Sequence, residues 1–229
     1  MKRYRWLQAD WPISMRALGR RLKARPFGPG VSHGFVIDRV RDDFLEGRYV
    51  ERIEFTETVT DPFGLELSFA RVEFRQSSFR ASPSGAGLEL RDPPRSVQAL
   101  LNRLSEASDF EVAITARTVD VLRWSAKFQE IAHLSPVVDS LQISDLELEP
   151  GIKAKIVVKG DRDVRSACNS LTGARKFEVE KIQLRVAAPS SGTIILGSSA
   201  SASIGIDDPE QRTLQALRAS LPARSGRYS

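Results

Sequence analysis

Apolar and polar residues alternate along much of residues 35–91, and a period of two predicts β-strands. Two such runs, VERIEFTETV and LELSFARVEF, are separated by TDPFG, whose aspartate, proline and glycine suit a tight reversal. We therefore expect a β-hairpin, followed by a further strand near Phe79. The flexible run ASPSGAG then leads to a short strand, LELR.

Apolar residues spaced three and four apart predict helices on either side of these strands. Ser14 can cap the first helix, SMRALGRRLKA, because its hydroxyl can accept a bond from a free backbone amide. Asp92 can cap a second helix, which Pro93 and Pro94 would begin.

Three further helices are expected in the second half of the chain. A connecting helix covers 122–134, and a short helix covers 164–171. Asp208 and Pro209 have the order of a cap and a first helical residue, so the last helix is expected to begin there.

The strand pattern returns between these helices. LQISDLELE and KAKIVV are joined by a Pro-Gly turn, and KFEVEKIQLRV follows the short helix as a returning strand. The run PSSGTIILGSSASASIGI comes next and contains a short apolar strand, Ile194–Leu196. Its small residues are typical of a mobile loop or a late edge strand.

An internal repeat joins the two halves. Residues 95–112 recur without a gap as residues 162–179, with 8 of 18 positions identical. The order of hairpin, helix and strand also matches, so we expect an α+β fold of two tandem β-hairpin–helix–strand units with mostly antiparallel sheet. The expected segments are a basic N-terminal arm with a short helix (1–30), a first α+β unit (31–119), a connecting helix and second unit (120–188), and a Gly/Ser-rich segment, C-terminal helix and tail (189–229).

The cysteine count and the hydropathy of the chain exclude some classes of protein. The one cysteine, Cys168, excludes an internal disulfide and therefore a cross-linked secreted scaffold. The N-terminal run lacks the continuous apolar stretch of a signal peptide, and no run approaches the roughly 20 apolar residues that span a bilayer. We expect a cytoplasmic protein without membrane insertion.

Positive charge is concentrated at the two ends of the chain. The first 30 residues hold eight cations and one acid, whereas residues 31–209 hold 22 cations and 27 acids. Cations this close together can act jointly on a phosphate backbone, although they can equally lie back against the acidic body. The predicted nucleic-acid contacts are Arg3, Arg5, Arg16, Arg20, Arg21, Lys23 and Arg25.

Two tryptophans lie among these arginines. Trp6 and Trp11 could stack on bases, but they could also be core residues or anchors for a partner protein. The alternative to nucleic-acid binding is therefore a protein–protein adaptor whose arm orders in the complex.

A second cationic group lies near the starts of the two repeat helices. Free amides at a helix N-terminus favour an anion, so Arg95, Lys159, Arg162 and Arg165 are secondary candidates for phosphate contact. The alternative is that these arginines pair with nearby acids such as Asp163.

Catalytic motifs are absent from the sequence. The two histidines, His33 and His133, are 100 positions apart, and no GxSxG or phosphate-loop motif occurs. Cys168 matches Leu101 in the repeat, which indicates a small buried hydrophobe. We expect no cofactor, metal or catalytic residue, and a non-enzymatic binding or assembly subunit. A divergent metal-dependent hydrolase or nuclease stays as the remaining alternative.

Overall fold

The computed structural model describes residues 1–187, 191–206 and 211–222. These residues form an α+β fold with five helices and eleven strands, and the strands that pair within each sheet run antiparallel. The chain divides into two compact units: unit 1 contains Met1–Gln8 and Thr115–Ser229, and unit 2 contains Ala9–Ile114. It crosses between them inside β1 (Lys2–Asp10) and inside β6 (Ala113–Ala116).

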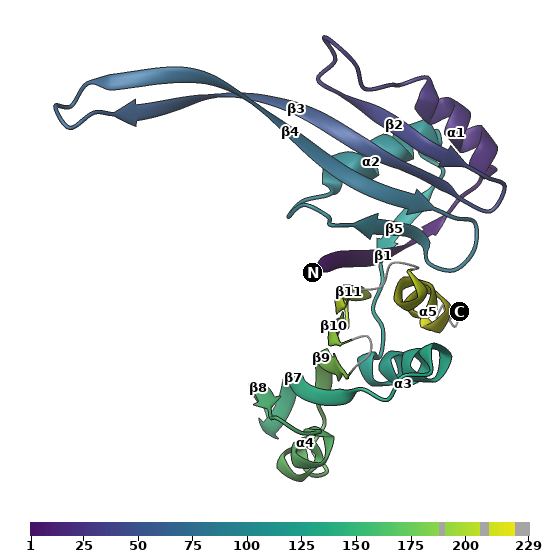
Figure 1. Ribbon diagram of the computed structural model, residues 1–229, viewed down its shortest axis with the longest axis vertical. Helices are drawn as coiled ribbons and strands as arrows, with labels where there is room; N and C mark the ends of the chain where they lie inside the picture. Colours follow the sequence, from purple (N-terminus) through teal and green to yellow (C-terminus); the bar gives the residue numbers. More distant parts are fainter. Residues whose placement is uncertain (188–190, 207–210, 223–229) are drawn as a thin grey trace. The chain divides into compact units, whose positions relative to one another are not determined.

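Unit 2 is a four-stranded antiparallel sheet covered by two helices on one face (Figure 1). The strands follow in chain order: β2 (His33–Val40), β3 (Leu45–Thr60), β4 (Glu66–Ala81) and β5 (Gly87–Arg91). The helices are α1 (Met15–Lys23) and α2 (Gln98–Ala107). Odd-numbered residues of β3 and β4 supply the core, because Leu45, Tyr49, Phe79 and Ala81 are all buried.

The predicted hairpin of unit 2 is confirmed and is longer than its sequence run suggested. β3 and β4 pair without interruption from Leu45↔Ala81 to Thr60↔Glu66, so the strand expected near Phe79 is the end of β4. The distal part of the hairpin extends beyond the helices and the other strands of unit 2 (Figure 1). We call residues 53–73 the distal ribbon.

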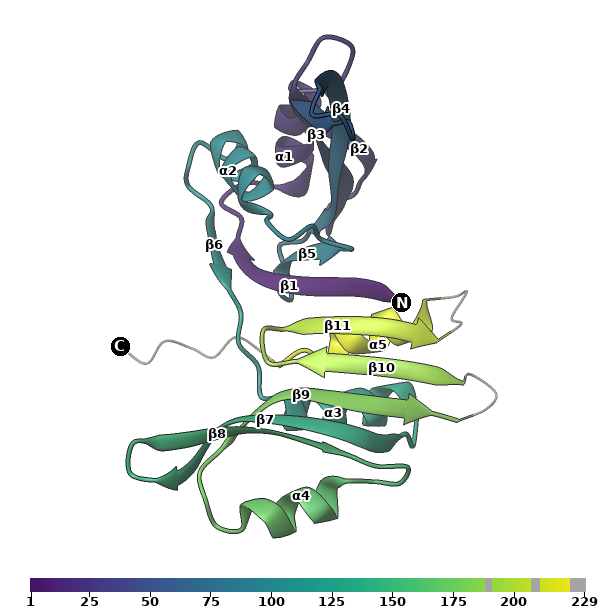
Figure 2. The same cartoon turned by 90° about the vertical axis from the view of Figure 1, so that its left-hand side faces the viewer.

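Unit 1 is a six-stranded antiparallel sheet in the order β1, β11, β10, β9, β7, β8 (Figure 2). The strands after β1 are β7 (Val137–Glu149), β8 (Ile152–Lys159), β9 (Glu178–Val186), β10 (Gly192–Gly197) and β11 (Ser201–Ile206). Its helices are α3 (Val121–Ala132), α4 (Arg165–Thr172) and α5 (Arg212–Ser220).

The helices of unit 1 cover one face of this sheet. α3 packs against β9 and β10, α4 packs against β7, and α5 packs against α3. Trp124 of α3 is fully buried and meets Trp6 of β1 edge to face, with ring centroids 5.6 Å apart. The opposite face of the sheet is turned away from α3 and α5 (Figure 2).

Two expectations about secondary structure are corrected, and a third lies outside the described residues. Asp92 does not cap a helix: its φ is 43°, and α2 begins at Gln98, because residues that precede proline are disfavoured in helical conformation. The small-residue run is neither a loop nor an edge, since β11 lies between β1 and β10. The predicted cap of the last helix, Asp208 and Pro209, lies outside the described residues.

Other local expectations are confirmed. The Ser14 hydroxyl accepts a hydrogen bond from the Ala17 amide and begins α1. The connecting helix α3 starts at Val121, and the Asp120 side chain accepts a hydrogen bond from the Arg123 amide as its N-cap. None of the helices in the described ranges is long and apolar enough to cross a membrane.

Candidate functional site

The predicted basic arm is a folded part of the protein. Residues 2–10 form β1, and residues 15–23 form α1, whose arginines contact acids of unit 2. Arg16 pairs with Asp42 and lowers its pKa, mainly through their hydrogen bond. Arg21 lies 2.6 Å from Asp109, and Arg25 lies 3.9 Å from Glu106. The first 30 residues are therefore not a free arm, and three of the seven predicted cations form ion pairs within the fold.

The remaining residues of the predicted set divide between two places. Arg20 and Lys23 are exposed on α1, and no carboxylate of the described residues lies within ion-pair distance of either. Arg3 and Arg5 belong to β1 and therefore to the sheet of unit 1.

The two tryptophans proposed as anchors are used inside the fold. Trp6 is 2% exposed and packs on Trp124. Trp11 is half-buried, and its indole N–H donates to the Gly87 carbonyl at 2.9 Å. Neither side chain is available as an anchor in an arm that orders on binding, so this expectation is also corrected.

The secondary cations are divided between the two units. Arg95 belongs to unit 2 and Arg162 to unit 1, and each lies three residues before its helix rather than at its first turn. Arg165 pairs with Asp163 at 2.8 Å and thereby lowers the pKa of that carboxyl group, as the structural alternative predicted. Lys159 ends β8 and, unlike the others, belongs to the sheet surface of unit 1 that carries Arg3 and Arg5.

This surface, which we call the open face, is the side of the unit 1 sheet opposite the buried residues Ile182, Leu184, Ile194 and Leu196. Residues that pair across antiparallel strands point to the same side, so the register arranges the open face in three rows. The first row is Arg5, Ser201, Gly197, Lys181, Gln142 and Val157. The second row is Arg3, Ser203, Ile195, Gln183, Ser140 and Lys159. The third row is Gly205, Thr193, Arg185 and Val137.

Cations and neutral hydrogen-bonding groups dominate the open face. Five of these sixteen positions are Lys or Arg, and none is an acid: Arg3, Arg5, Lys159, Lys181 and Arg185. The Nε atom of Arg5 is buried without a hydrogen-bond partner. Within the described ranges, no carboxylate lies at ion-pair distance from Lys159 or Lys181. The serine, threonine and glutamine residues between them add polar groups suited to phosphate oxygens.

Two acids enter the open face where β-bulges interrupt the register of β7 and β9. Glu180 accepts from Lys155 at 2.5 Å and from Gln142 at 2.6 Å, and Asp139 lies 3.4 Å from Arg185. The hydrogen bond from Lys155 is the main reason why the pKa of Glu180 is lowered, so this carboxylate is ionised at neutral pH. The bulges therefore neutralise part of the positive charge along β9.

The cationic part of the open face ends before the turn between β7 and β8. Past these bulges, Glu178 is paired with Ser144 and Glu147 with Lys153, so acids return toward the turn between β7 and β8. The positive region therefore covers β1 to β9 and the Lys159 end of β8, rather than the whole sheet.

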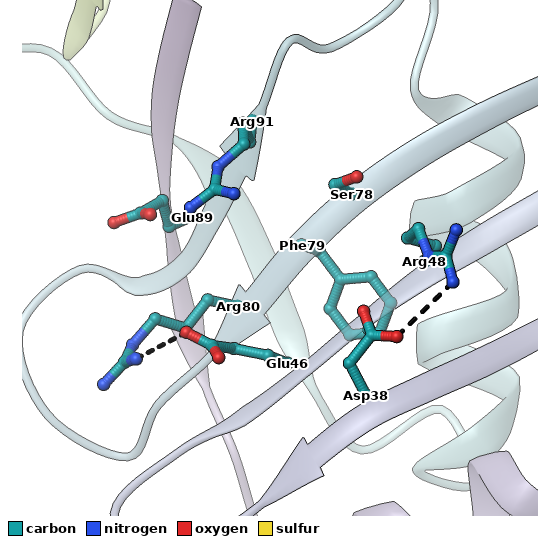
Figure 3. A pocket seen from close by; sticks show the side chains of 9 residues that line it. Asp38, Glu46, Arg48, Ser78, Phe79, Arg80, Glu89 and Arg91 are labelled. Atoms are coloured by element: carbon teal, nitrogen blue, oxygen red, sulfur yellow. Dashed lines mark hydrogen bonds and ion pairs between the residues drawn. The ribbon is translucent and has the colours of Figure 1, made fainter. Parts of the chain in front are cut away.

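A polar pocket of about 220 Å³ lies on unit 2 (Figure 3). Its lining includes three acids and three arginines: Asp38, Glu46, Glu89, Arg48, Arg80 and Arg91. Arg80 lies 2.7 Å from Glu46, and Arg48 lies 3.4 Å from Asp38, as the dashed lines in Figure 3 show. Because the lining has equal numbers of acids and arginines and four of these six residues form two ion pairs, this pocket is a weak candidate for ligand binding.

The residues considered for catalysis are divided between the two units. His33 lies on β2 of unit 2, and His133 ends α3 of unit 1 with a φ of 52°. Cys168 is 2% exposed, and burial raises the pKa of its thiol, as expected for a packed residue. The described parts of the chain contain no group of three or more His, Cys, Asp or Glu that could hold a metal ion.

Sequence reasoning missed the open face although its signal was present. Lys181, Gln183 and Arg185 occupy alternate positions of a predicted strand, whereas Arg3 and Arg5 alternate in a segment that was expected to be an arm and forms β1 instead. The sequence pattern does not show which strands are neighbours in the sheet, so it could not place these cations on one surface. No family model matches this chain, and no curated protein matches it significantly.

Proposed function

We propose that this protein is a non-enzymatic subunit that binds the backbone of single-stranded nucleic acid across the open face of unit 1. The observation that supports the proposal is the clustering of five cations, with no acid among the paired positions, on a sheet surface that no helix of unit 1 covers. The proposal keeps the polyanion contact expected from the sequence and moves it from an N-terminal arm to a sheet.

Shape and spacing support a single strand as the ligand. The small side chains of Ser201 and Ser203 keep this part of β11 low, so an extended chain can lie across it. Successive rows are about 6.8 Å apart, and neighbouring strands are about 4.8 Å apart. Arg5 and Lys181, three strands apart, are thus about 14 Å from each other along the sheet and can contact separate phosphates.

The side chains of the open face favour binding that ignores base sequence. Its sixteen paired positions include no aromatic residue, so the surface lacks the stacking platforms of base-reading sheets. Lys and Arg charges, hydroxyl groups and amide groups instead match phosphate and sugar oxygens. Binding is therefore expected to be strongly salt-dependent and nearly independent of sequence.

The internal duplication is retained as part of the proposal. α2 and α4 begin at Gln98 and Arg165, 67 residues apart, as the repeat requires. Each helix follows a β-hairpin, although β5 intervenes in unit 2. We propose that one of the two related hairpin–helix segments contributed the nucleic-acid surface and the other became the scaffold of unit 2.

A charge-removal series tests the proposal. Lys159→Gln with Lys181→Gln should weaken binding to a labelled oligothymidylate about tenfold at moderate salt. The slope of log affinity against log salt should decrease by roughly 1.4, because each lost phosphate contact removes about 0.7. Fluorescence anisotropy at several salt concentrations measures both quantities.

The matched control removes the same charge from α1. Arg20→Gln with Lys23→Gln changes two exposed cations of the predicted arm and should leave affinity and slope nearly unchanged. Glu180→Gln should do the opposite of the lysine substitutions and tighten binding a few-fold, because it removes a negative charge and releases Lys155. Loss of binding in the α1 variant, with retention in the lysine variant, would return the contact to the N-terminal segment.

A further inference from the structure

The distal ribbon has two chemically different faces. Odd-numbered residues Phe55, Val59, Leu67 and Phe69 lie on one face, and each is between 45% and 49% exposed. The other face carries mainly polar residues, Glu54, Thr56, Thr58, Thr60, Glu66 and Ser68, together with Ala70 and with Val72 at its inner end. We call the first the apolar ribbon face. The tip adds Phe63 and Leu65, which are 96% and 60% exposed.

The apolar ribbon face continues the core face of unit 2. Odd-numbered positions of β3 and β4 are buried beneath α1 and α2 near the body, where Leu45, Tyr49 and Phe79 lie. The register continues without a break into the ribbon, where Glu51 and Arg75 interrupt the apolar face before Phe55 and Phe69 resume it. The distal ribbon therefore carries an apolar group on the side that continues the core, and no other described element of unit 2 covers it (Figure 1).

An uncovered ribbon of this kind needs a partner. A two-stranded hairpin is only marginally stable in water, whereas a second layer against its apolar face makes a sheet persistent. The six apolar side chains of the ribbon face and tip expose on the order of 600 Å², which is at the upper end of the largest apolar patch on a typical monomer, a size that is often functional.

We propose that the apolar ribbon face is a dimer interface, covered by the same face of a second copy of this chain. The charge on the face favours an identical partner, because Glu57 and Arg71 lie 2.6 Å apart and form a closed, neutral pair. Because the two charges of this pair cancel each other, the pair neither repels the same face of a second copy nor favours binding of a charged ligand. Two copies would bury about 1,200 Å², the lower bound of standard stable interfaces, and a face that pairs with itself forms a closed two-fold contact.

Sedimentation equilibrium of the full chain without nucleic acid tests the dimer. Wild-type protein should show a concentration-dependent dimer, and Phe55→Glu with Phe69→Glu should raise its dissociation constant at least 100-fold. Thr56→Glu with Ser68→Glu adds the same charge to the opposite face of the same strands and should change the constant less than about threefold. Circular dichroism melting checks that both double variants fold.

Thiol labelling provides a second measurement that does not depend on the glutamate variants. Val59→Cys and Thr58→Cys place cysteines on opposite faces of the ribbon, and the native Cys168 is buried. Labelling at Val59→Cys should slow as protein concentration rises, while labelling at Thr58→Cys should not. Wild-type protein that stays monomeric at the highest concentrations, or a dimer lost only in the Thr56/Ser68 variant, overturns the proposal. In that case the apolar ribbon face would be expected to bind a different protein.

Discussion

At the scale of single residues, Gly87 shows how a close backbone approach fixes one position. Its φ is 91°, and a Cβ atom placed there would lie 2.1 Å from the Ala9 carbonyl oxygen. The Ala9 amide donates to the neighbouring Ala86 carbonyl at 3.1 Å, and Trp11 donates to Gly87 itself. The glycine therefore allows residues 9–11 to lie directly on the start of β5 within unit 2.

Substitution at this glycine should be costly. Gly87→Ala combines a left-handed backbone with a backbone clash and should lower the free energy of unfolding by about 3 kcal/mol or more. Gly85→Ala is the matched control, because Gly85 also has a positive φ of 67° but no atom within 4 Å of the added Cβ. That change should cost about 1 kcal/mol. Urea denaturation of both variants measures the difference, and equal losses would refute the steric argument.

At the scale of elements, the turn of the distal ribbon depends on one side chain. The Asp61 carboxylate accepts from the amides of Phe63 and Leu65, both at 2.8 Å, and Gly64 supplies the positive φ that closes the turn. The turn fixes the register of both strands and therefore decides which residues form the apolar ribbon face.

Removing this carboxylate should loosen the ribbon locally. Asp61→Ala should reduce hydrogen-exchange protection around residues 60–66 by about tenfold, because two hydrogen bonds are lost, while the global free energy of unfolding changes little. Thr58→Ala is the control, since it removes the 3.2 Å contact with the Ser68 hydroxyl but leaves the turn intact. Equal protection in the Asp61 variant and the wild type would show that the turn does not need the side chain.

Elements whose signals are local were predictable from the sequence. Ser14 begins α1, and Asp61 with Gly64 closes the hairpin, because each acts on backbone within a few residues. β11 was not predicted because Ser201–Ile206 forms a strand through its pairing with β1 and β10 and not through its own composition. The open face was missed for the same reason, since Arg5 and Lys181 are brought onto one surface only by the order of strands that are distant in sequence.

At the scale of the whole molecule, the two proposed surfaces belong to different units and should act separately. Phe55→Glu with Phe69→Glu should leave the affinity of unit 1 for a short oligothymidylate within about twofold, because none of the open-face cations is on the ribbon. The number of strands bound should be two per wild-type dimer and one per monomeric variant. Mass photometry or titration calorimetry measures this ratio, and a monomer that no longer binds would contradict the separation.

Unit 1 combines residues 1–8 with residues 115–229, and this separation in sequence affects the order of folding during synthesis. Arg3, Tyr4 and Arg5 pair with Ser203, Ala202 and Ser201, which leave the ribosome almost 200 residues later. Unit 2 is contiguous in the chain, so all of its residues are available before β11 is made. Assembly of the unit 1 sheet therefore depends on synthesis of β11, and a polypeptide that stops before it leaves Lys2–Arg5 without the strand that links β1 to β10.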